Sequence, residues 1–178
     1  MDKMQLARDI YNTAHLTGTF LLRSGQTSAE YFDKFLFSAN PSLLSRIAVA
    51  METIIPKNCD VLAGLELGAI PVVTALSLQT GLPAAFVRKE AKSYGTCRQA
   101  EGADVSGRRV CVVEDIVSTG GAIIDFVGGL RKSGAIVEDV VCVVLRNPKA
   151  HDILAGHGLT LTPAFTMEEL KAAAGVPI

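Results

Sequence analysis

The stretch that most constrains the fold is residues 110–122, which reads Val-Cys-Val-Val-Glu-Asp-Ile-Val-Ser-Thr-Gly-Gly-Ala. It begins as a short, β-branched apolar run, which is typical of a strand buried in a parallel sheet. The run ends at two adjacent carboxylates, Glu114 and Asp115, and two hydroxyl residues and two glycines follow shortly after. A helical pattern begins at Ala122. This order places the acids and a tight turn where a buried strand gives way to a helix.

The turn at residues 118–121 suits a phosphate group. Its backbone N–H groups would lie at the positive end of a helix dipole, and its glycines allow an anion to approach closely. The two carboxylates could not share that phosphate pocket, and they suit ribose hydroxyls or a hydrated metal ion. A ribose 5-phosphate satisfies both halves. The alternative, a plain strand-end turn, is less favoured because two acids after an apolar run are costly to bury without partners.

Composition indicates one soluble globular domain spanning residues 1–178. Hydrophobic residues make up 49% of the chain and charged residues 20%, and the net charge of −1 gives no reason to expect nucleic acid or membrane binding. The polar N-terminus lacks the apolar core of a signal peptide. The cysteines, at positions 59, 97, 111 and 142, are widely spaced, which favours a reduced, cytoplasmic chain.

Hydrophobic patterns predict strands that alternate with helices along most of the chain. Right-handed crossovers between such strands give a parallel sheet covered by helices on both faces. A Thr-x-x-Glu capping box at Thr166 predicts a C-terminal helix that ends near Gly175. Helices are also expected at 3–15, 41–54, 71–80 and from 122, strands at 60–65, 82–87, 109–114 and 140–145, two short strands around Ser24-Gly25, and a loop at 149–158.

The connection that follows the strand at 82–87 is long and basic. It shows no sustained periodicity up to the strand at 109–114, and connections of this length in compact domains are usually functional or disordered. Arg88, Lys89, Lys92 and Arg98 concentrate there in a chain that is otherwise near neutral. A solvated charged turn is the alternative reading. It is weaker here, because a polyanionic ligand of the neighbouring motif needs such cations.

Residues 110–122 resemble the PRPP-binding motif of type I phosphoribosyltransferases, and they fit neither a Walker A nor a Gly-x-Gly-x-x-Gly motif. Residues 20–33 resemble the Phe-x-Leu-x-Ser-Gly-x-x-Ser-x-x-Tyr-Phe-Asp segment of orotate phosphoribosyltransferases, and residues 88–95 resemble their catalytic loop. The resemblance covers roughly residues 15–147. It implies an α/β type I phosphoribosyltransferase fold, with a small hood formed by about residues 1–40 and the C-terminal segment.

The resemblance assigns the central motif to PRPP. Glu114 and Asp115 would hold the ribose hydroxyls and favour the cationic ring of the transition state, and residues 118–122 would bind the 5′-phosphate. The PRPP-binding segment of the family corresponds here to Glu114, Asp115, Ile116, Val117, Ser118, Thr119, Gly120, Gly121 and Ala122.

The resemblance also assigns the basic residues to the pyrophosphate of PRPP, namely Arg23, Arg88, Lys89 and Lys92, with Lys92 as the main catalytic candidate. Tyr94 stands where the family commonly has histidine, and tyrosine can donate a hydrogen bond but is not cationic near neutral pH. Residues 64–68 resemble the family's pyrophosphate loop, with Gly68 where many members carry lysine. That charge must then come from elsewhere or from Mg²⁺.

For the base, the resemblance implies that Arg146 binds the orotate carboxylate, that Tyr31 and Phe32 border the pyrimidine, and that Ser118 contacts orotate. The implied reaction joins orotate and PRPP to give orotidine 5′-monophosphate and pyrophosphate in pyrimidine biosynthesis. Mg²⁺ would be the cofactor, carried mainly by PRPP rather than by a dedicated ligand cage. The loop at 88–105 would reach the neighbouring active site of a homodimer.

Two alternatives stay open at this point. The nearer is a phosphoribosyltransferase for another base, since Arg146, Tyr31 and Phe32 indicate an acidic pyrimidine only through the resemblance. The other is a non-catalytic PRPP-sensing regulator that binds nucleic acid. The Lys92 loop and the lack of a basic face or helix-turn-helix pattern count against it.

Overall fold

The computed structural model describes residues 2–21, 25–89 and 99–177. Its centre is a six-stranded sheet with the strand order β5-β4-β3-β6-β7-β8, in which only β5 runs antiparallel to its neighbour. A separate antiparallel hairpin, β1-β2, precedes the sheet in the chain. The strands are β1 (His15–Leu21), β2 (Thr27–Phe32), β3 (Val61–Leu65), β4 (Ala84–Val87), β5 (Ala100–Gly102), β6 (Arg109–Val117), β7 (Ile136–Leu145) and β8 (Thr160–Thr166).

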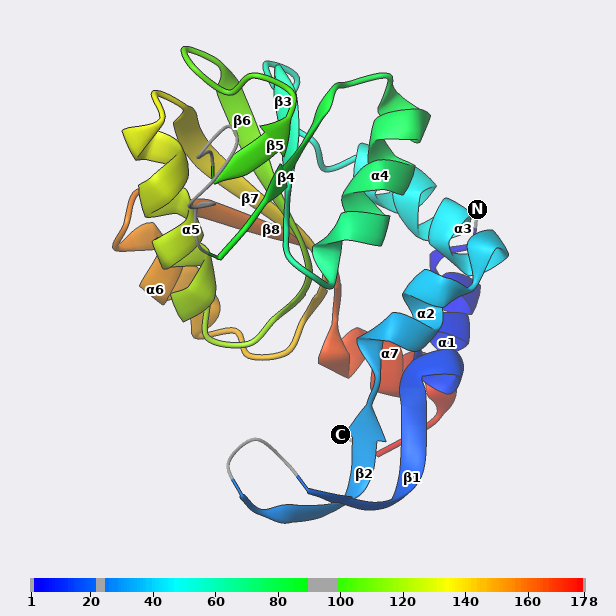
Figure 1. Cartoon of the computed structure of the whole chain (residues 1–178). Coiled ribbons are helices and arrows are strands. Elements are labelled where there is room, and N and C mark those ends of the chain that lie inside the picture. Colours follow the sequence, from blue (N-terminus) through cyan, green and yellow to red (C-terminus); the bar gives the residue numbers. More distant parts are fainter. Residues whose placement is uncertain (1, 22–24, 90–98, 178) are drawn as a thin grey trace.

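Helices cover both faces of the sheet, as the sequence predicts (Figure 1). One face packs against α3 and α4 and, farther out, α1 and α7, while the other packs against α5 and α6. The alternation of β6 feeds both cores, because Cys111 and Val113 face the first side and Val110 and Val112 the second. The helices are α1 (Lys3–Ala14), α2 (Lys34–Ala39), α3 (Pro41–Glu52), α4 (Ala69–Thr80), α5 (Gly121–Lys132), α6 (Ala150–Ala155) and α7 (Met167–Ala174).

The β1-β2 hairpin projects beyond the sheet with α1, α2 and α7 at its base, and we call these residues, 3–39 and 167–174, the hood (Figure 1). Contacts between α1 and α7 join the two ends of the chain. The predicted capping box starts α7, with the Thr166 hydroxyl accepting from the Glu169 N–H and the Glu169 carboxylate accepting from the Thr166 N–H. Gly175, in the left-handed conformation, ends this helix. The C-terminal segment is thereby fixed beside the hairpin.

The structure corrects several expected boundaries. The central strand continues past the carboxylates to Val117, because Ile116 and Val117 still pair with Val144 and Leu145 of β7. Residues 150–155 form the short helix α6 instead of a loop, and its buried Ala150 and Leu154 pack on the sheet. The long connection contains the short edge strand β5. The sequence pattern predicts neither α2 nor β8. Pro163 lies in β8, which tolerates proline because it is an edge strand of the sheet.

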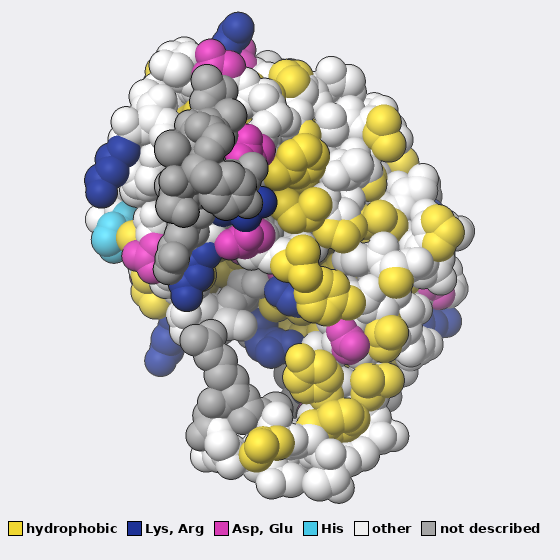
Figure 2. Space-filling model, in the orientation of Figure 1, with side chains coloured by type: hydrophobic (Ala, Val, Ile, Leu, Met, Phe, Trp, Pro, Cys, Tyr) yellow, Lys and Arg dark blue, Asp and Glu magenta, His cyan; other side chains and the backbone are white. Residues whose placement is uncertain are grey.

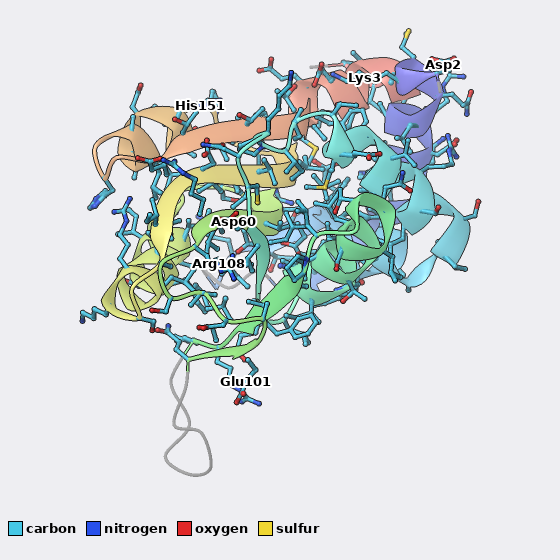
Figure 3. All side chains as sticks on the ribbon, turned by 90° about the horizontal axis from the view of Figure 1, so that it is seen from above. Asp2, Lys3, Asp60, Glu101, Arg108 and His151 are labelled. Carbon is cyan, nitrogen blue, oxygen red and sulfur yellow. The ribbon has the colours of Figure 1, made fainter. Side chains whose placement is uncertain are left out.

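No helix among the described residues is long and apolar enough to cross a bilayer. At the end of the sheet opposite the acidic motif, Asp60 and Arg109 hold β3 and β6 together. The Asp60 carboxylate, directly before β3, accepts the backbone N–H of Arg109 at 2.8 Å, and the backbone N–H of Asp60 donates to the Arg109 carbonyl at 2.9 Å. Asp60 and Arg108 lie close together at this end, and His151 lies apart from them on α6 (Figure 3).

Candidate active site

The two carboxylates lie near the carboxyl end of β6, beside β3. From β3 the chain continues to β4 on one side of that strand, whereas β6 lies on its other side. The strand order therefore reverses between β3 and β6. Ligands of open α/β sheets bind at such a point. The Asp115 side chain is 1% exposed, and its Oδ1 accepts the Ile116 N–H at 2.6 Å. Glu114 Oε2 accepts the Asp115 N–H at 3.0 Å. The acidic pair is therefore held by its own strand.

Burial, and then the negative charge of Asp115, raise the pKa of Glu114 to about 8. Near neutral pH the protonated form of Glu114 is then favoured, and the adjacent acids do not both carry full charge. Protonated Glu114 offers a donor as well as an acceptor, whereas Asp115 faces a cation, as described below. The pair can accordingly present both hydrogen-bond roles to the hydroxyls of a sugar.

The turn after β6 has the form that a phosphate requires. Ser118 and Thr119 are exposed, and Gly120 adopts a left-handed φ of +79° that turns the chain into α5. The first N–H groups of a helix have no partners within it, so those at the start of α5 are available to an anion. Ile116 and Val117 belong to the strand, and the side chain of Val117 packs in the core. Only the backbone of these two residues and the half-buried side chain of Ile116 could contact a ligand.

Lys34 reaches the acidic pair from the hood, and sequence reasoning missed it. Its Nζ lies 3.1 Å from Asp115 Oδ1 as a hydrogen bond and 2.9 Å from Oδ2. Asp33 caps α2 by accepting the Phe35 N–H, which fixes Lys34 in the first turn of that helix. The only available signal was the position of Lys34 directly after the recognised Tyr-Phe-Asp segment. The structure thus places a cation that no local pattern predicts.

Gly68 follows β3 and is packed against this ion pair. A Cβ at position 68 would lie 1.7 Å from Asp115 Oδ2 and 2.7 Å from Lys34 Nζ. Leu67, beside it, is exposed, and the Glu66 carboxylate accepts the backbone N–H of Lys89. The turn after β3 therefore connects the acidic pair to the end of β4, where Arg88 and Lys89 are exposed.

A cavity of about 410 Å³ opens between the hairpin and the sheet. It brings together three of the four residues predicted for the base, Tyr31, Phe32 and Arg146. The Arg146 guanidinium carbon lies 6.0 Å from the centre of the Phe32 ring, and the Arg146 N–H donates to the Val117 carbonyl at 2.8 Å. Ser118, the fourth, does not line this cavity. The remaining lining residues are Tyr11, His15, Ser28, Glu30, Met167 and Lys171.

Sequence reasoning did not include the polar residues on the far side of this cavity. His15 Nε2 and Glu30 Oε2 are 2.8 Å apart across the hairpin, and Lys171 comes from α7. Figure 2 shows a hollow between the hairpin and the rest of the molecule, with basic side chains gathered at its margin. The predicted residues Arg23, Lys92 and Tyr94 lie outside the described residues. Within the described residues, no three His, Cys, Asp or Glu side chains form a metal-binding group.

Comparison with known proteins identifies this arrangement. Residues 37–156 match the phosphoribosyl transferase domain family. The chain is 52% identical over 168 residues to an orotate phosphoribosyltransferase of Nocardioides sp., with 94% of each chain covered. The chain belongs to the orotate phosphoribosyltransferase family. An orotate phosphoribosyltransferase of Methanopyrus kandleri is 37% identical, with 96% of this chain and 93% of the relative covered.

Solved members of the orotate phosphoribosyltransferase family share the fold. The Mycobacterium tuberculosis orotate phosphoribosyltransferase in complex with Fe(III) dicitrate is similar with a TM-score of 0.84 and 30% identity, over 96% of this chain and 99% of that one. A structure of the same enzyme in complex with PRPP is similar with a TM-score of 0.82 and 28% identity, over the same shares. The predicted type I phosphoribosyltransferase fold is therefore confirmed.

Proposed function

We propose that this chain transfers the 5-phosphoribosyl group of PRPP to orotate, giving orotidine 5′-monophosphate and pyrophosphate for pyrimidine biosynthesis. The observation that carries this proposal is the continuity of three subsites. The acidic pair lies on β6 and the phosphate turn follows directly after that strand. The backbone N–H of Arg146, a residue of the base cavity, donates to the carbonyl of Val117, the last residue of β6. Relatives that cover nearly the whole chain are named for this reaction, which supports the same conclusion.

The reaction needs a nucleophilic orotate nitrogen to replace pyrophosphate at C1 of the ribose. The C1–N bond forms as the C1–O bond to pyrophosphate breaks, and the ring passes through an oxocarbenium-like state. No covalent enzyme intermediate is required, so catalysis consists mainly of orientation and of stabilising charge. Glu114 and Asp115 hold the ribose hydroxyls, and the negative charge of Asp115 stabilises the cationic ring. Residues 118–122 hold the 5′-phosphate at the start of α5.

The leaving pyrophosphate needs cations. Arg88 and Lys89, which are exposed at the end of β4, lie on the side of the sheet where the β3 turn meets the acidic pair. We assign Arg23 and Lys92 to the same group, with Lys92 as the main residue that stabilises the departing charge, and Tyr94 as a neutral hydrogen-bond donor to the pyrophosphate. In the base cavity, Arg146 receives the orotate carboxylate, because a planar guanidinium binds a carboxylate with two hydrogen bonds. Tyr31 and Phe32 border the pyrimidine, and Ser118 reaches orotate from the phosphate turn.

The oxygen donors of the site fit a Mg²⁺ ion that arrives bound to PRPP. The acidic pair supplies hard oxygen donors; buried Asp115 Oδ2 accepts no hydrogen bond among the described residues, although Lys34 Nζ lies 2.9 Å from it in the ion pair. Two adjacent acids do not form a full coordination shell, so phosphate and water oxygens would provide most ligands. When bound, Mg²⁺ would supply positive charge to the pyrophosphate, and the acidic pair would orient the ribose.

The proposal extends to the assembly and the compartment. A homodimer would let the loop at 88–105 of one subunit reach the neighbouring active site and exclude water from it. Cys59, Cys111 and Cys142 are free thiols, which fits a reducing compartment such as the cytoplasm.

A panel of bases separates the proposed function from its rivals. The purified chain is incubated with PRPP and Mg²⁺ together with orotate, uracil, adenine or guanine, and released pyrophosphate is measured. Pyrophosphate release with orotate and with none of the other three bases supports the proposal. Preference for another base indicates a different phosphoribosyltransferase, and PRPP binding without release for any base indicates a sensor.

A further inference from the structure

The ion pair between Lys34 and Asp115 has one buried end and one open end. The Asp115 side chain is 1% exposed, whereas that of Lys34 is 37% exposed. An ammonium carries three N–H donors, and one of them is used by Asp115 Oδ1. The open side of Lys34 therefore retains donor capacity toward whatever occupies the space outside the acidic pair.

Gly68 explains why this cation has to come from another element. A side chain at position 68 would collide with Asp115, because its Cβ would lie only 1.7 Å from Asp115 Oδ2. The turn after β3 consequently cannot carry its own lysine at this point while Asp115 keeps its position. Lys34 Nζ, 2.7 Å from the same ideal Cβ, already occupies the neighbouring space. One cation thus takes the place of a side chain that the turn cannot hold.

The segment that carries Lys34 also borders the base cavity. Phe32 ends β2 and lines that cavity, Asp33 donates its N–H to the Ala14 carbonyl at 2.8 Å, and Lys34 follows at once. In this short segment, Phe32 therefore faces the base cavity and Lys34 faces the acidic pair. A substrate that joins these two places would contact both.

We propose that Lys34 binds the pyrophosphate group of PRPP, in addition to holding the Asp115 carboxylate in place. This inference rests on the proposed function, because it names the residue that supplies the cation of the β3 turn. The N–H groups of Lys34 that do not contact Asp115 bind the leaving group, and the N–H group that donates to Asp115 Oδ1 orients that carboxylate. The competing role is neutralisation of the buried carboxylate alone, since an unpaired buried charge is costly.

A double-mutant cycle on Lys34 and Asp115 tests the inference. Binding of inorganic pyrophosphate with Mg²⁺, and of ribose 5-phosphate, is measured by calorimetry for wild type, Lys34→Met, Lys34→Arg, Asp115→Asn and the double variant of Lys34→Met with Asp115→Asn. The Asp115→Asn background removes the charge that Lys34→Met would leave unpaired, so the double variant can fold even if the single variant does not. Lys3→Met is the matched control, because Lys3 pairs with Glu169 at 3.2 Å on the surface between α1 and α7 (Figure 3).

The expected result is a loss of pyrophosphate affinity of about tenfold or more in Lys34→Met, as for one charge-assisted hydrogen bond. A similar loss is expected on going from Asp115→Asn to the double variant, with no change in Lys3→Met and partial retention in Lys34→Arg. Pyrophosphate affinity that stays unchanged in the Asp115→Asn background would overturn the inference and leave only the neutralising role. Pyrophosphate binding is measured without turnover, so a failure of the proposed orotate reaction is recognised separately.

Discussion

The guanidinium of Arg146, at the end of β7, lies 6.0 Å from the centre of the Phe32 ring, at the end of β2. A cation from the sheet and an aromatic ring from the hood therefore meet across the base cavity. A planar base with an acidic substituent suits this pair, because the ring offers a stacking surface and the guanidinium offers two parallel donors.

Replacing Arg146 should change the KM for orotate and not the KM for PRPP. We expect Arg146→Gln to raise the KM for orotate by about tenfold or more, the worth of a charge-assisted hydrogen bond, with little change in the KM for PRPP. The control is Lys171→Gln, which removes the other cation that lines the cavity, from α7. A larger effect of Lys171→Gln would contradict the assignment and place the carboxylate beside α7.

The acidic pair makes a prediction about stability and pH. The pKa of Glu114 is raised to about 8, chiefly by burial, from an ordinary value of 4.5. The native state therefore keeps a proton that the unfolded chain releases, so the free energy of unfolding falls as the pH rises from 4.5 through about 8. Glu114→Gln keeps the shape without the titration. We expect this variant to flatten that slope and to be more stable than wild type at about pH 9, by on the order of 2 kcal/mol.

Chemical denaturation across this pH range measures the effect. Glu138→Gln is a suitable control, because the Glu138 side chain is 64% exposed on β7 and pairs with Arg109 at the surface. It should leave the slope unchanged. A Glu114→Gln variant with the full wild-type slope would show that another group carries the pH dependence.

The phosphate turn depends on the left-handed conformation of Gly120. Gly120→Ala would strain the backbone at φ +79°, and the new Cβ would lie 3.0 Å from Leu154 Cγ. We expect a stability loss of about 1–2 kcal/mol together with a clear loss of ribose 5-phosphate affinity. Gly81→Ala is the matched control, since Gly81 has φ +74° at the end of α4 with open space around it. Equal phosphate affinities in the two variants would refute the role of the turn.

The central motif was predictable because it is local. Strand, acids, glycine turn and helix follow within residues 110–122, and the structure keeps that order, although β6 extends to Val117 through its pairing with β7. Lys34 was not predictable, because its contact with Asp115 joins residues 81 positions apart and depends on how the hood packs. The short elements β5 and α6 escaped detection because three and six residues are too few for a clear period.

Arg146 occupies a middle position between these cases. The apolar run of β7 predicts that the residue after it lies at the edge of the sheet that carries the site. That the side chain meets Phe32 follows only from the placement of the hairpin, which no sequence period specifies. The sequence therefore indicated the edge and the motif, whereas the partners that complete each subsite required the folded chain.

The most direct test of the central claim follows orotate itself. The chain is mixed with orotate, PRPP and Mg²⁺, and the loss of orotate absorbance is recorded beside the pyrophosphate formed, for wild type and for Asp115→Asn. The account predicts that wild type consumes orotate and forms pyrophosphate in equal amounts and that Asp115→Asn is strongly impaired. Unchanged orotate absorbance with wild type, or equal rates for the two proteins, would contradict it.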